Sequence, residues 1–352
     1  MVQNKKNILL VIRRGSAEIE WIAPIIQSFD FKFNLYVFFL TEEAYENCIN
    51  DKVSFSIIKK YQKKQFIQKK MDRAFIKGAR RILPKNIFFP KLTEIIHDTR
   101  YLKSKLLINK NDKIDLVLAE FGNYSQWIAK IKKNDLSKVV HFPSTPAVYL
   151  EENKKSANGV KKLLGDYLLV NSKIDIKYWS KFIKKNKIFS FGVPMFEKTW
   201  LKKKIKKNKN FENKKYKKIL FAYSSYFGQV NSKDFIKLDT QLNQVMQTFN
   251  MIKNVKIIVK IHPNKNHPHF LNILKKYNKN LWEVSDQNLI SLSNECDVVV
   301  SNFQSAASIF GPLMAKPSIE LWKGVDSIYN TNKSWNTRLG ITTVVSTKND
   351  LK

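Results

Sequence analysis

Two short polar stretches in the second half of the chain follow buried-type strands and carry residues that can bind phosphate. The apolar run Val255–Ile261 ends in His262-Pro263, and Asp297–Val300 ends in the polar stretch SNFQS, whose last residue is Ser305. Continuous apolar runs of this length are typical of strands in a parallel sheet that is covered on both faces. Ligands bind at the carboxyl ends of such strands, so we expect His262 and Ser305 to face one crevice.

The first half of the chain places acids and an imidazole at comparable strand ends. Glu18 follows the first strand in the turn RRGSAE, Glu120 ends a second strand, and His141 ends a third, with Ser144 just beyond it. Any of Glu18, Glu120 and His141 could act as a general base. Glu18 has a second interpretation, because an acid in the first turn of a helix stabilises the helix dipole.

Strands and helices alternate along the whole chain, which predicts an α/β fold with doubly wound parallel sheets. We expect an N-terminal Rossmann-like domain over residues 1–197, a Lys/Asn-rich linker over 198–218 and a C-terminal Rossmann-like domain over 219–352. In the first of these, Ser16 is the expected N-cap of a helix over Glu18–Phe29. The last residues resemble the first turn of a helix, which suggests that the natural chain continues.

Length and composition fit a two-domain protein. The 352 residues are too many for one ordinary core, and 43% are hydrophobic. Leu35–Leu40, the longest apolar run, has the length of a strand and not of a membrane span. The chain has two cysteines, which lie in no metal-like spacing and fit a reducing compartment.

The formal net charge of +34 comes almost entirely from lysine, since only seven residues are arginine. A Lys/Asn-biased genome is one explanation, and attraction to an anionic membrane surface or an acidic polymer is the second. No nucleic-acid-binding motif accompanies the charge, so we expect no nucleic-acid partner.

The segment Tyr61–Leu83 has apolar residues at helical spacing and a strongly basic opposite face. Such a helix could lie on an anionic membrane, although a domain helix with a solvated lysine face is the simpler interpretation. The cations that would contact lipid are Lys63, Lys64, Lys69, Lys70, Arg73, Lys77, Arg80 and Arg81.

Two Rossmann-like domains facing across a cleft resemble the GT-B glycosyltransferase fold. In the second half, KIHPN and the later Ser-rich turn resemble motifs of bacterial sialyltransferases, capsule Kdo transferases and teichoic-acid glycerophosphotransferases. That resemblance implies that His262 and Ser305 hold the phosphates of a nucleotide donor. A helix N-terminus with a serine hydroxyl is also a suitable anion site on physical grounds. The remaining residues that the resemblance implies on the donor side are Pro263, Ser301, Asn302, Ser224 and Ser225.

The turn RGSAEIEWIAPII is similar to the turn after the first strand in the Kdo transferases of lipid A assembly. Glu18 and Pro24 match the spacing in that family, whose Glu is the catalytic base, and Gly15 and Ser16 then lie on the acceptor side with Ser144. The stretch also resembles the non-hydrolysing UDP-N-acetylglucosamine 2-epimerases. Those enzymes carry paired glutamates after the later Ser turn, where this chain has Ser308-Ile309-Phe310.

Phe310 also marks a departure from the glycosyltransferase pattern. Many GT-B enzymes have a ribose-binding glutamate seven residues before the proline that follows this helix, and counting back from Pro317 gives Phe310. A donor ribose would therefore be held by another group in this chain. The identity of the nucleotide base and of the sugar stays open, with CMP or CDP donors favoured over UDP only by analogy.

The sequence thus predicts a glycosyltransferase that moves a sugar or polyol phosphate from a nucleotide-activated donor to a cell-surface polysaccharide or glycolipid, as in capsule or lipopolysaccharide synthesis. We expect an inverting, metal-independent reaction with no cofactor, in the cytoplasm or at the inner face of the cytoplasmic membrane. The alternatives are a 2-epimerase and a non-catalytic basic GT-B scaffold that binds a membrane or polymer.

Replacing His262 with Ala should abolish binding of the nucleotide donor, because the imidazole is expected to donate a hydrogen bond to a donor phosphate. Thermal-shift titration with CMP, CDP, UDP and GDP measures this, since a ligand that binds the folded state raises the melting temperature by mass action. Equal shifts for the variant and the wild type would contradict the assignment.

Overall fold

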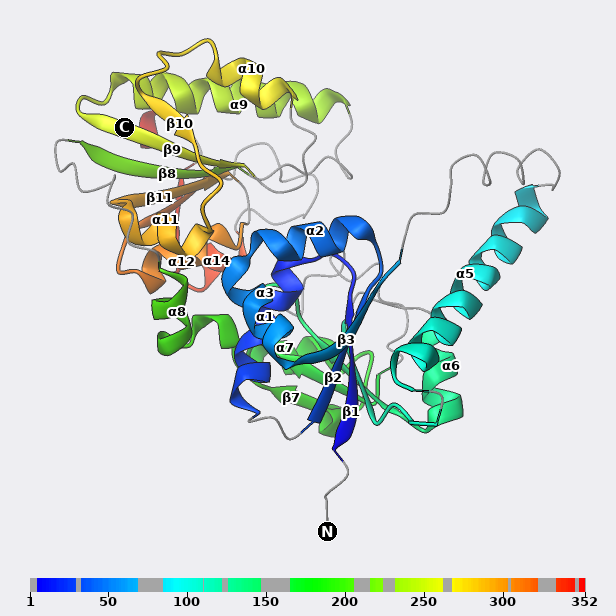
Figure 1. Ribbon diagram of the computed structural model, residues 1–352. Helices are drawn as coiled ribbons and strands as arrows, with labels where there is room; N and C mark the ends of the chain where they lie inside the picture. Colours follow the sequence, from blue (N-terminus) through cyan, green and yellow to red (C-terminus); the bar gives the residue numbers. More distant parts are fainter. Residues whose placement is uncertain are drawn as a thin grey trace. The chain divides into compact units, whose positions relative to one another are not determined.

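The computed structural model describes residues 5–29, 33–68, 85–109, 111–121, 126–146, 165–205, 216–223, 232–261, 268–302, 305–321, 334–345 and 348–351. The chain folds as two compact units, Met1–Glu197 (unit 1) and Lys198–Lys352 (unit 2). Each unit is an α/β domain with its own parallel sheet (Figure 1).

Unit 1 is built on a parallel sheet of seven strands in the order β3-β2-β1-β4-β5-β6-β7. The first strand lies inside the sheet because the chain adds β2 and β3 on one side of it and then returns to add β4 on the other. The strands are β1 Lys6–Ile12, β2 Phe33–Phe39, β3 Gln62–Ile67, β4 Leu116–Glu120, β5 Lys138–Phe142, β6 Tyr167–Val170 and β7 Ile188–Ser190.

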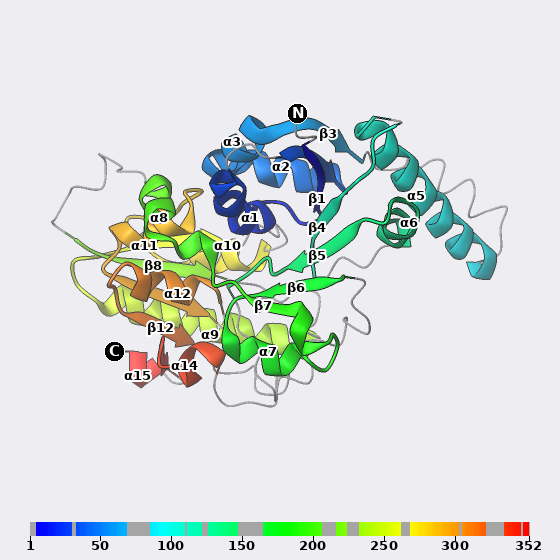
Figure 2. The same ribbon diagram turned by 90° about the horizontal axis from the view of Figure 1, so that it is seen from below.

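Helices cover both faces of this sheet, with α5 and α6 on one side and α1, α2 and α3 on the other (Figure 2). Leu9, Val11 and Phe38 of the strands pack with Trp127 and Ile128 of α6. The helices are α1 Ser16–Ser28, α2 Glu42–Asn50, α3 Lys52–Tyr61, α5 Lys85–Leu107, α6 Gln126–Asp135 and α7 Lys173–Trp179, with the short 3-10 turns η1 Lys185–Lys187 and η2 Pro194–Phe196.

Unit 2 repeats the same winding in a six-stranded parallel sheet of order β10-β9-β8-β11-β12-β13. Its strands are β8 Lys217–Tyr223, β9 Val255–Ile261, β10 Trp282–Val284, β11 Val298–Asn302, β12 Ser318–Leu321 and β13 Thr343–Val345. Its helices are α8 Lys198–Lys204, α9 Ser232–Met251, α10 Pro268–Leu274, α11 Leu289–Glu295, α12 Ala307–Leu313, α14 Trp335–Arg338 and α15 Lys348–Leu351.

The two faces of the unit 2 sheet bury separate apolar clusters. On one face, Phe221 and Val259 pack with Met246 and Phe249 of α9 and with Phe270 of α10. On the other face, Leu220, Ile258 and Val299 pack against Leu292 of α11. Alternate residues of each strand supply the two clusters, as the period of two in a β-strand requires. The predicted fold class, two Rossmann-like parallel-sheet domains, is therefore confirmed.

The helix predicted over Tyr61–Leu83 is wrong where the structure describes it. Helix α3 ends at Tyr61, Gln62 takes an extended backbone, and Gln62–Ile67 forms the edge strand β3. This strand pairs in parallel with β2, and Phe66 packs on Phe38 with ring centroids 4.8 Å apart. The backbone hydrogen bonds to β2 stabilise the strand, and the spacing of apolar residues in the sequence gives no information about such pairing. The rest of the segment lies outside the described residues.

Two further local expectations differ from the structure. Gly15 and not Ser16 is the N-cap of α1, and Ser16 is the first helical residue. The segment expected to be a linker begins with helix α8, whose Trp200 and Leu201 are buried. The carbonyl oxygen of Lys204 in this helix also accepts hydrogen bonds from Asn288 and Ser291 of unit 2, which a count of charged residues does not reveal.

Gly15 occupies a backbone position that a side chain would strain. Its φ is 107°, and an added Cβ would lie 2.6 Å from Cβ of Asn47 and 2.7 Å from the carbonyl oxygen of Ala44. Gly192 also has a positive φ, 82°, but an added Cβ there meets nothing within 4 Å. A comparison of the two glycines therefore separates the cost of backbone strain, which both share, from the cost of steric overlap, which only Gly15 would have.

We expect Gly15→Ala to lower the free energy of unfolding by roughly 3 kcal/mol, from backbone strain plus overpacking. Gly192→Ala should cost about 1 kcal/mol, since only the backbone term applies. Urea denaturation of the two variants measures both values. Equal losses would show that the space around Gly15 can relax.

Candidate active site

The turn between β1 and α1 is held by the side chain of Glu18. Its Oε2 accepts hydrogen bonds from the backbone N–H groups of Arg13, Arg14 and Gly15 at 2.8, 2.6 and 3.0 Å. The residue is fully buried, and its Oε1 has no hydrogen-bond partner among the described residues. One carboxylate oxygen therefore closes the turn while the other is unengaged within the part of the chain that the structure describes.

Burial raises the pKa of Glu18 to about 7. The loss of hydration disfavours the charged carboxylate, and the negative charge of Glu120 adds to this. The three backbone amides act in the opposite direction, because they stabilise the carboxylate. A carboxyl group with a pKa near 7 can accept a proton efficiently at neutral pH.

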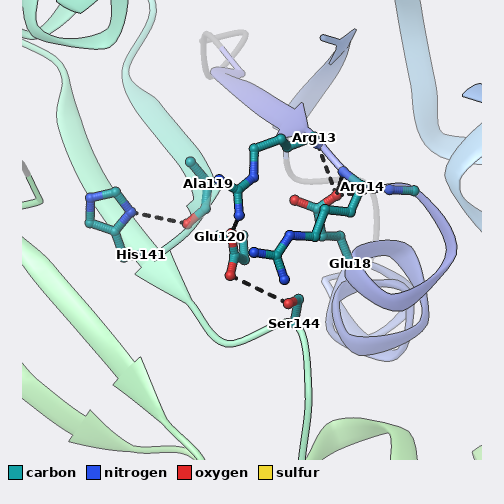
Figure 3. Close-up of polar contacts among 8 residues, drawn as sticks. Arg13, Arg14, Glu18, Ala119, Glu120, His141 and Ser144 are labelled. Atoms are coloured by element: carbon teal, nitrogen blue, oxygen red, sulfur yellow. Dashed lines mark hydrogen bonds and ion pairs between the residues drawn. The ribbon is translucent and has the colours of Figure 1, made fainter. Parts of the chain in front are cut away.

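Glu120 lies at the end of β4, beside β1, and is linked to the same turn. Nη2 of Arg13 forms an ion pair with its Oε2 at 3.0 Å, and the Ser144 hydroxyl donates to its Oε1 at 3.4 Å. Glu120 is almost fully buried. Figure 3 shows Arg13 joining the two acids, since its backbone N–H meets Glu18 and its guanidinium meets Glu120.

These groups lie where ligands bind in open α/β sheets. The strand order of unit 1 reverses between β1 and β4, and Arg13, Glu18 and Glu120 all stand at the carboxyl ends of these two strands. Crevices at such reversal points accept ligands because the helices on the two sides diverge there. Gly15 and Ser144 are buried beside the acids, whereas Ser16 is partly exposed.

His141 is placed apart from the acids. It pairs in register with Ala119, one residue before Glu120, so its side chain leaves the opposite face of the sheet. Its Nδ1 lies 3.2 Å from the carbonyl oxygen of Ala119, and Figure 3 shows the ring turned away from Glu18 and Glu120. Burial lowers the pKa of His141 to about 4, which keeps the imidazole neutral at pH 7.

In unit 2, the described serines hold the start of helix α12. The hydroxyl groups of Ser301 and Ser308 are 2.6 Å apart, and Oγ of Ser305 accepts a hydrogen bond from the backbone N–H of Ala307 at 3.2 Å. The carbonyl oxygen of Ser305 accepts a further bond from Nδ2 of Asn336. Hydrogen bonds to its hydroxyl group and to its carbonyl oxygen thus hold Ser305 in place.

Several residues predicted on the donor side lie outside the described residues, and their assignment stays a prediction. They are His262, Pro263, Ser224, Ser225 and the side chain of Asn302. Phe310, at the position where the resemblance led us to look for a ribose-binding glutamate, is buried in α12.

The sequence reasoning missed the roles of Arg13 and Glu320. Arg13 was not among the predicted site residues, although an arginine that directly follows a buried strand is a sequence signal that indicates a position at the ligand-binding edge. Glu320 of β12 is fully buried and accepts hydrogen bonds from the hydroxyl groups of Ser334, Thr337 and Thr342. Burial raises the pKa of Glu320. Its partners follow it by 14 to 22 positions, so only the fold brings them together.

A metal-ligand cluster and a membrane-spanning helix are both absent from the described residues. No three His, Cys, Asp or Glu side chains come together as metal ligands there. Within the same residues, no helix is both long and apolar enough to cross a membrane.

A hollow of about 790 Å³ is present in unit 2, but it does not lie at the carboxyl ends of the central strands. It is lined by residues from the amino ends of β8 and β9 and from both ends of β10. Because chemistry in such folds occurs at the opposite edge of the sheet, we place the candidate site with the acids of unit 1.

No protein-family model and no curated protein sequence matches the chain. Solved structures match over nearly its whole length. The UDP-GlcNAc 2-epimerase of Neisseria meningitidis bound to UDP-GlcNAc superposes with a TM-score of 0.61 at 12% identity, covering 98% of this chain and 89% of that one. S. aureus MnaA in complex with UDP gives 0.61 at 11% identity, with 98% and 86% covered.

A plant enzyme of a different kind matches equally widely. Arabidopsis thaliana UGT89C1 complexed with quercetin has a TM-score of 0.58 at 11% identity, with 99% of this chain and 88% of that chain covered. A UDP-GlcNAc 2-epimerase and UGT89C1 therefore share one architecture with this chain. At these identities the likeness shows the fold, which is GT-B, and does not choose between the activities.

The raised pKa of Glu18 predicts a pH-dependent stability. The folded state binds more protons than the unfolded state between about pH 4.5 and 7, so the free energy of unfolding falls as pH rises through this window. The loss amounts to roughly 3 kcal/mol from the size of the shift. Glu18→Gln mimics the protonated acid and should remove this loss. Urea denaturation of wild type and variant from pH 5 to 8 measures the difference.

The matched control is Glu43→Gln, at an exposed position in the first turn of α2. That substitution should leave the slope of stability against pH unchanged. A constant stability difference between Glu18→Gln and the wild type across the range would show that Glu18 titrates as it does in the unfolded chain.

Proposed function

We propose that this protein is a glycosyltransferase that uses a nucleotide-activated sugar or polyol phosphate and modifies a polysaccharide or glycolipid acceptor. The observation that carries the proposal is the pair of buried carboxylates, Glu18 and Glu120, at the strand-order reversal of unit 1. The GT-B fold supports it, because solved proteins of this fold are described in complex with UDP, with UDP-GlcNAc and with quercetin.

In this proposal Glu18 is the general base and Glu120 is the second candidate. With a sugar donor, the acceptor oxygen attacks the anomeric carbon as its proton passes to Oε1 of Glu18, and the bond to the donor phosphate breaks, leaving its electron pair on the phosphate. With a polyol phosphate donor the same oxygen attacks phosphorus, and the nucleoside phosphate leaves with the electron pair. Glu18 is buried, so the acceptor hydroxyl reaches it only when the β1–α1 turn admits the acceptor. Attack opposite the leaving group inverts the configuration.

The donor phosphates are assigned to unit 2, on His262, Ser305 and the Ser224-Ser225 turn. Ser305 precedes α12 at the carboxyl end of β11, and the other three assignments rest on the sequence motifs. Hydrogen-bond donors that are already in position stabilise the charge that develops on the leaving phosphate. The proposed reaction uses no metal ion or cofactor.

The proposed location is the cytoplasm, or the inner face of the cytoplasmic membrane where a lipid-linked acceptor would lie. Lys63 and Lys64 are exposed on the edge strand β3 and are available to an anionic surface. The other cations proposed for this contact belong to 69–81, outside the described residues.

Glu18→Gln should retain the fold and nucleotide binding but lower turnover by at least about 100-fold, since the amide cannot accept the proton. The measurement is nucleotide release from a panel of nucleotide sugars with an acceptor glycan, alongside calorimetric titration with the nucleotide. Normal turnover in this variant would move the base to Glu120, which Glu120→Gln tests in the same assay.

The same assay separates the proposal from the epimerase alternative. A transferase releases nucleotide only when an acceptor is present, whereas a 2-epimerase converts UDP-N-acetylglucosamine without one. The environment of α12 favours the transferase, because Ser308 bonds to Ser301 and Phe310 is buried where the epimerases carry paired glutamates. No binding to any nucleotide would indicate a non-catalytic scaffold.

A further inference from the structure

Lys260 lies near the carboxyl end of β9, in register with residues of the three strands that follow β9 across the unit 2 sheet. Lys260 of β9 pairs with Ala222 of β8, Ala222 pairs with Ser301 of β11, and Ser301 pairs with Glu320 of β12. Residues in register on parallel strands point to the same face of the sheet. These four side chains therefore lie in one row on one face of the sheet, and the row crosses the reversal of strand order between β8 and β11.

Lys260 is partly buried, and its ammonium group has no ion pair or hydrogen bond with any residue that the structure describes. The charge of Asp286 acts on it, but burial dominates and lowers its pKa. A lysine that loses hydration without gaining a close partner destabilises the fold. Within the described residues no contacting acid offsets the burial of Lys260, so a bound anion would stabilise its charge.

Lys256 provides the contrast, because it lies on the same strand and the same face. Its Nζ is 3.4 Å from Oε2 of Glu283 on the neighbouring strand β10. Lys256 lies two residues before Ile258 on β9, and Lys260 lies two residues after it. Among the described residues, only Lys256, the lysine farther from the carboxyl end of the strand, contacts an acid. The lysine without a contacting acid is thus the one that lies nearer the ligand-binding edge of the sheet.

The next two side chains in the row, which are buried, form no hydrogen bond with the Lys260 ammonium group. Ala222 contributes only a methyl group, and the Ser301 hydroxyl is turned to Ser308. His262 follows Lys260 by two residues in the sequence. A lysine ammonium offers three hydrogen-bond donors and suits a phosphate oxygen as a point charge.

We propose that Lys260 binds a phosphate group of the nucleotide donor at the carboxyl end of β9. This inference rests on the proposed function, because it takes the donor's phosphate as the anion that compensates the partly buried ammonium. It adds a binding residue within the described part of unit 2, where the strand order reverses.

The test compares Lys260→Met with Lys256→Met, since methionine keeps the aliphatic stem and removes the charge. The probes are inorganic pyrophosphate and the nucleotides CMP, CDP, UDP and GDP, titrated by calorimetry into each full-length variant. We expect Lys260→Met to weaken binding of the strongest probe at least about tenfold, as the loss of a charge-assisted hydrogen bond implies. Lys256→Met should bind as the wild type does.

The melting temperature of each variant without ligand shows whether a loss of binding comes from a folding defect. Lys260→Met should melt at or above the wild-type temperature, because it removes an uncompensated charge, and Lys260→Gln is the second variant if methionine impairs expression. Equal affinities for Lys260→Met and wild type would overturn this inference and leave the proposed function standing. Equal losses in both lysine variants would also overturn it, since they would indicate a general charge effect. If no probe binds the wild type, the proposed function falls and the inference falls with it.

Discussion

A single carboxylate oxygen, Oε2 of Glu18, holds the turn on which the candidate site of unit 1 depends. Three consecutive backbone N–H groups point at it, and the turn passes through Gly15 with a φ of 107°. The amides that could have bound a ligand anion are thus engaged by a side chain of the protein itself. What unit 1 presents in their place is an acid with one unengaged oxygen within the described residues, next to a second acid.

Arg13 connects these acids and limits their repulsion. Two carboxylates buried close together raise each other's pKa unless a cation intervenes. The guanidinium of Arg13 pairs with Glu120 at 3.0 Å, while burial of Glu18 raises its pKa to about 7. Both acids are buried, but Glu120 is paired with a cation whereas Glu18 is held by backbone N–H groups. Such a difference is how neighbouring carboxylates acquire separate roles in catalysis.

Much of the fold could be predicted from sequence, because buried parallel strands are recognisable apolar runs. The strand over Val255–Ile261 has the bounds that we predicted. The edge strand β3 was taken for a helix, since its apolar residues fit either period and its pairing with β2 is a long-range event. The N-cap at Gly15 was missed for a similar reason, because its close contacts with Ala44 and Asn47 come from α2.

For the site, the sequence by itself determined the list of chemical groups and the strand ends that carry them, since those follow from local order along the chain. Only the tertiary structure decided which of them meet. It set Glu18 and Glu120 on one face with Arg13 between them, and it sent His141 to the other face, because successive residues of a strand point to opposite sides. It also gathered hydroxyl groups around Glu320 and left Lys260 partly buried. Burial and register are properties of the packed sheet, so the pKa of Glu18 and the neighbours of Lys260 could not be derived from residue order alone.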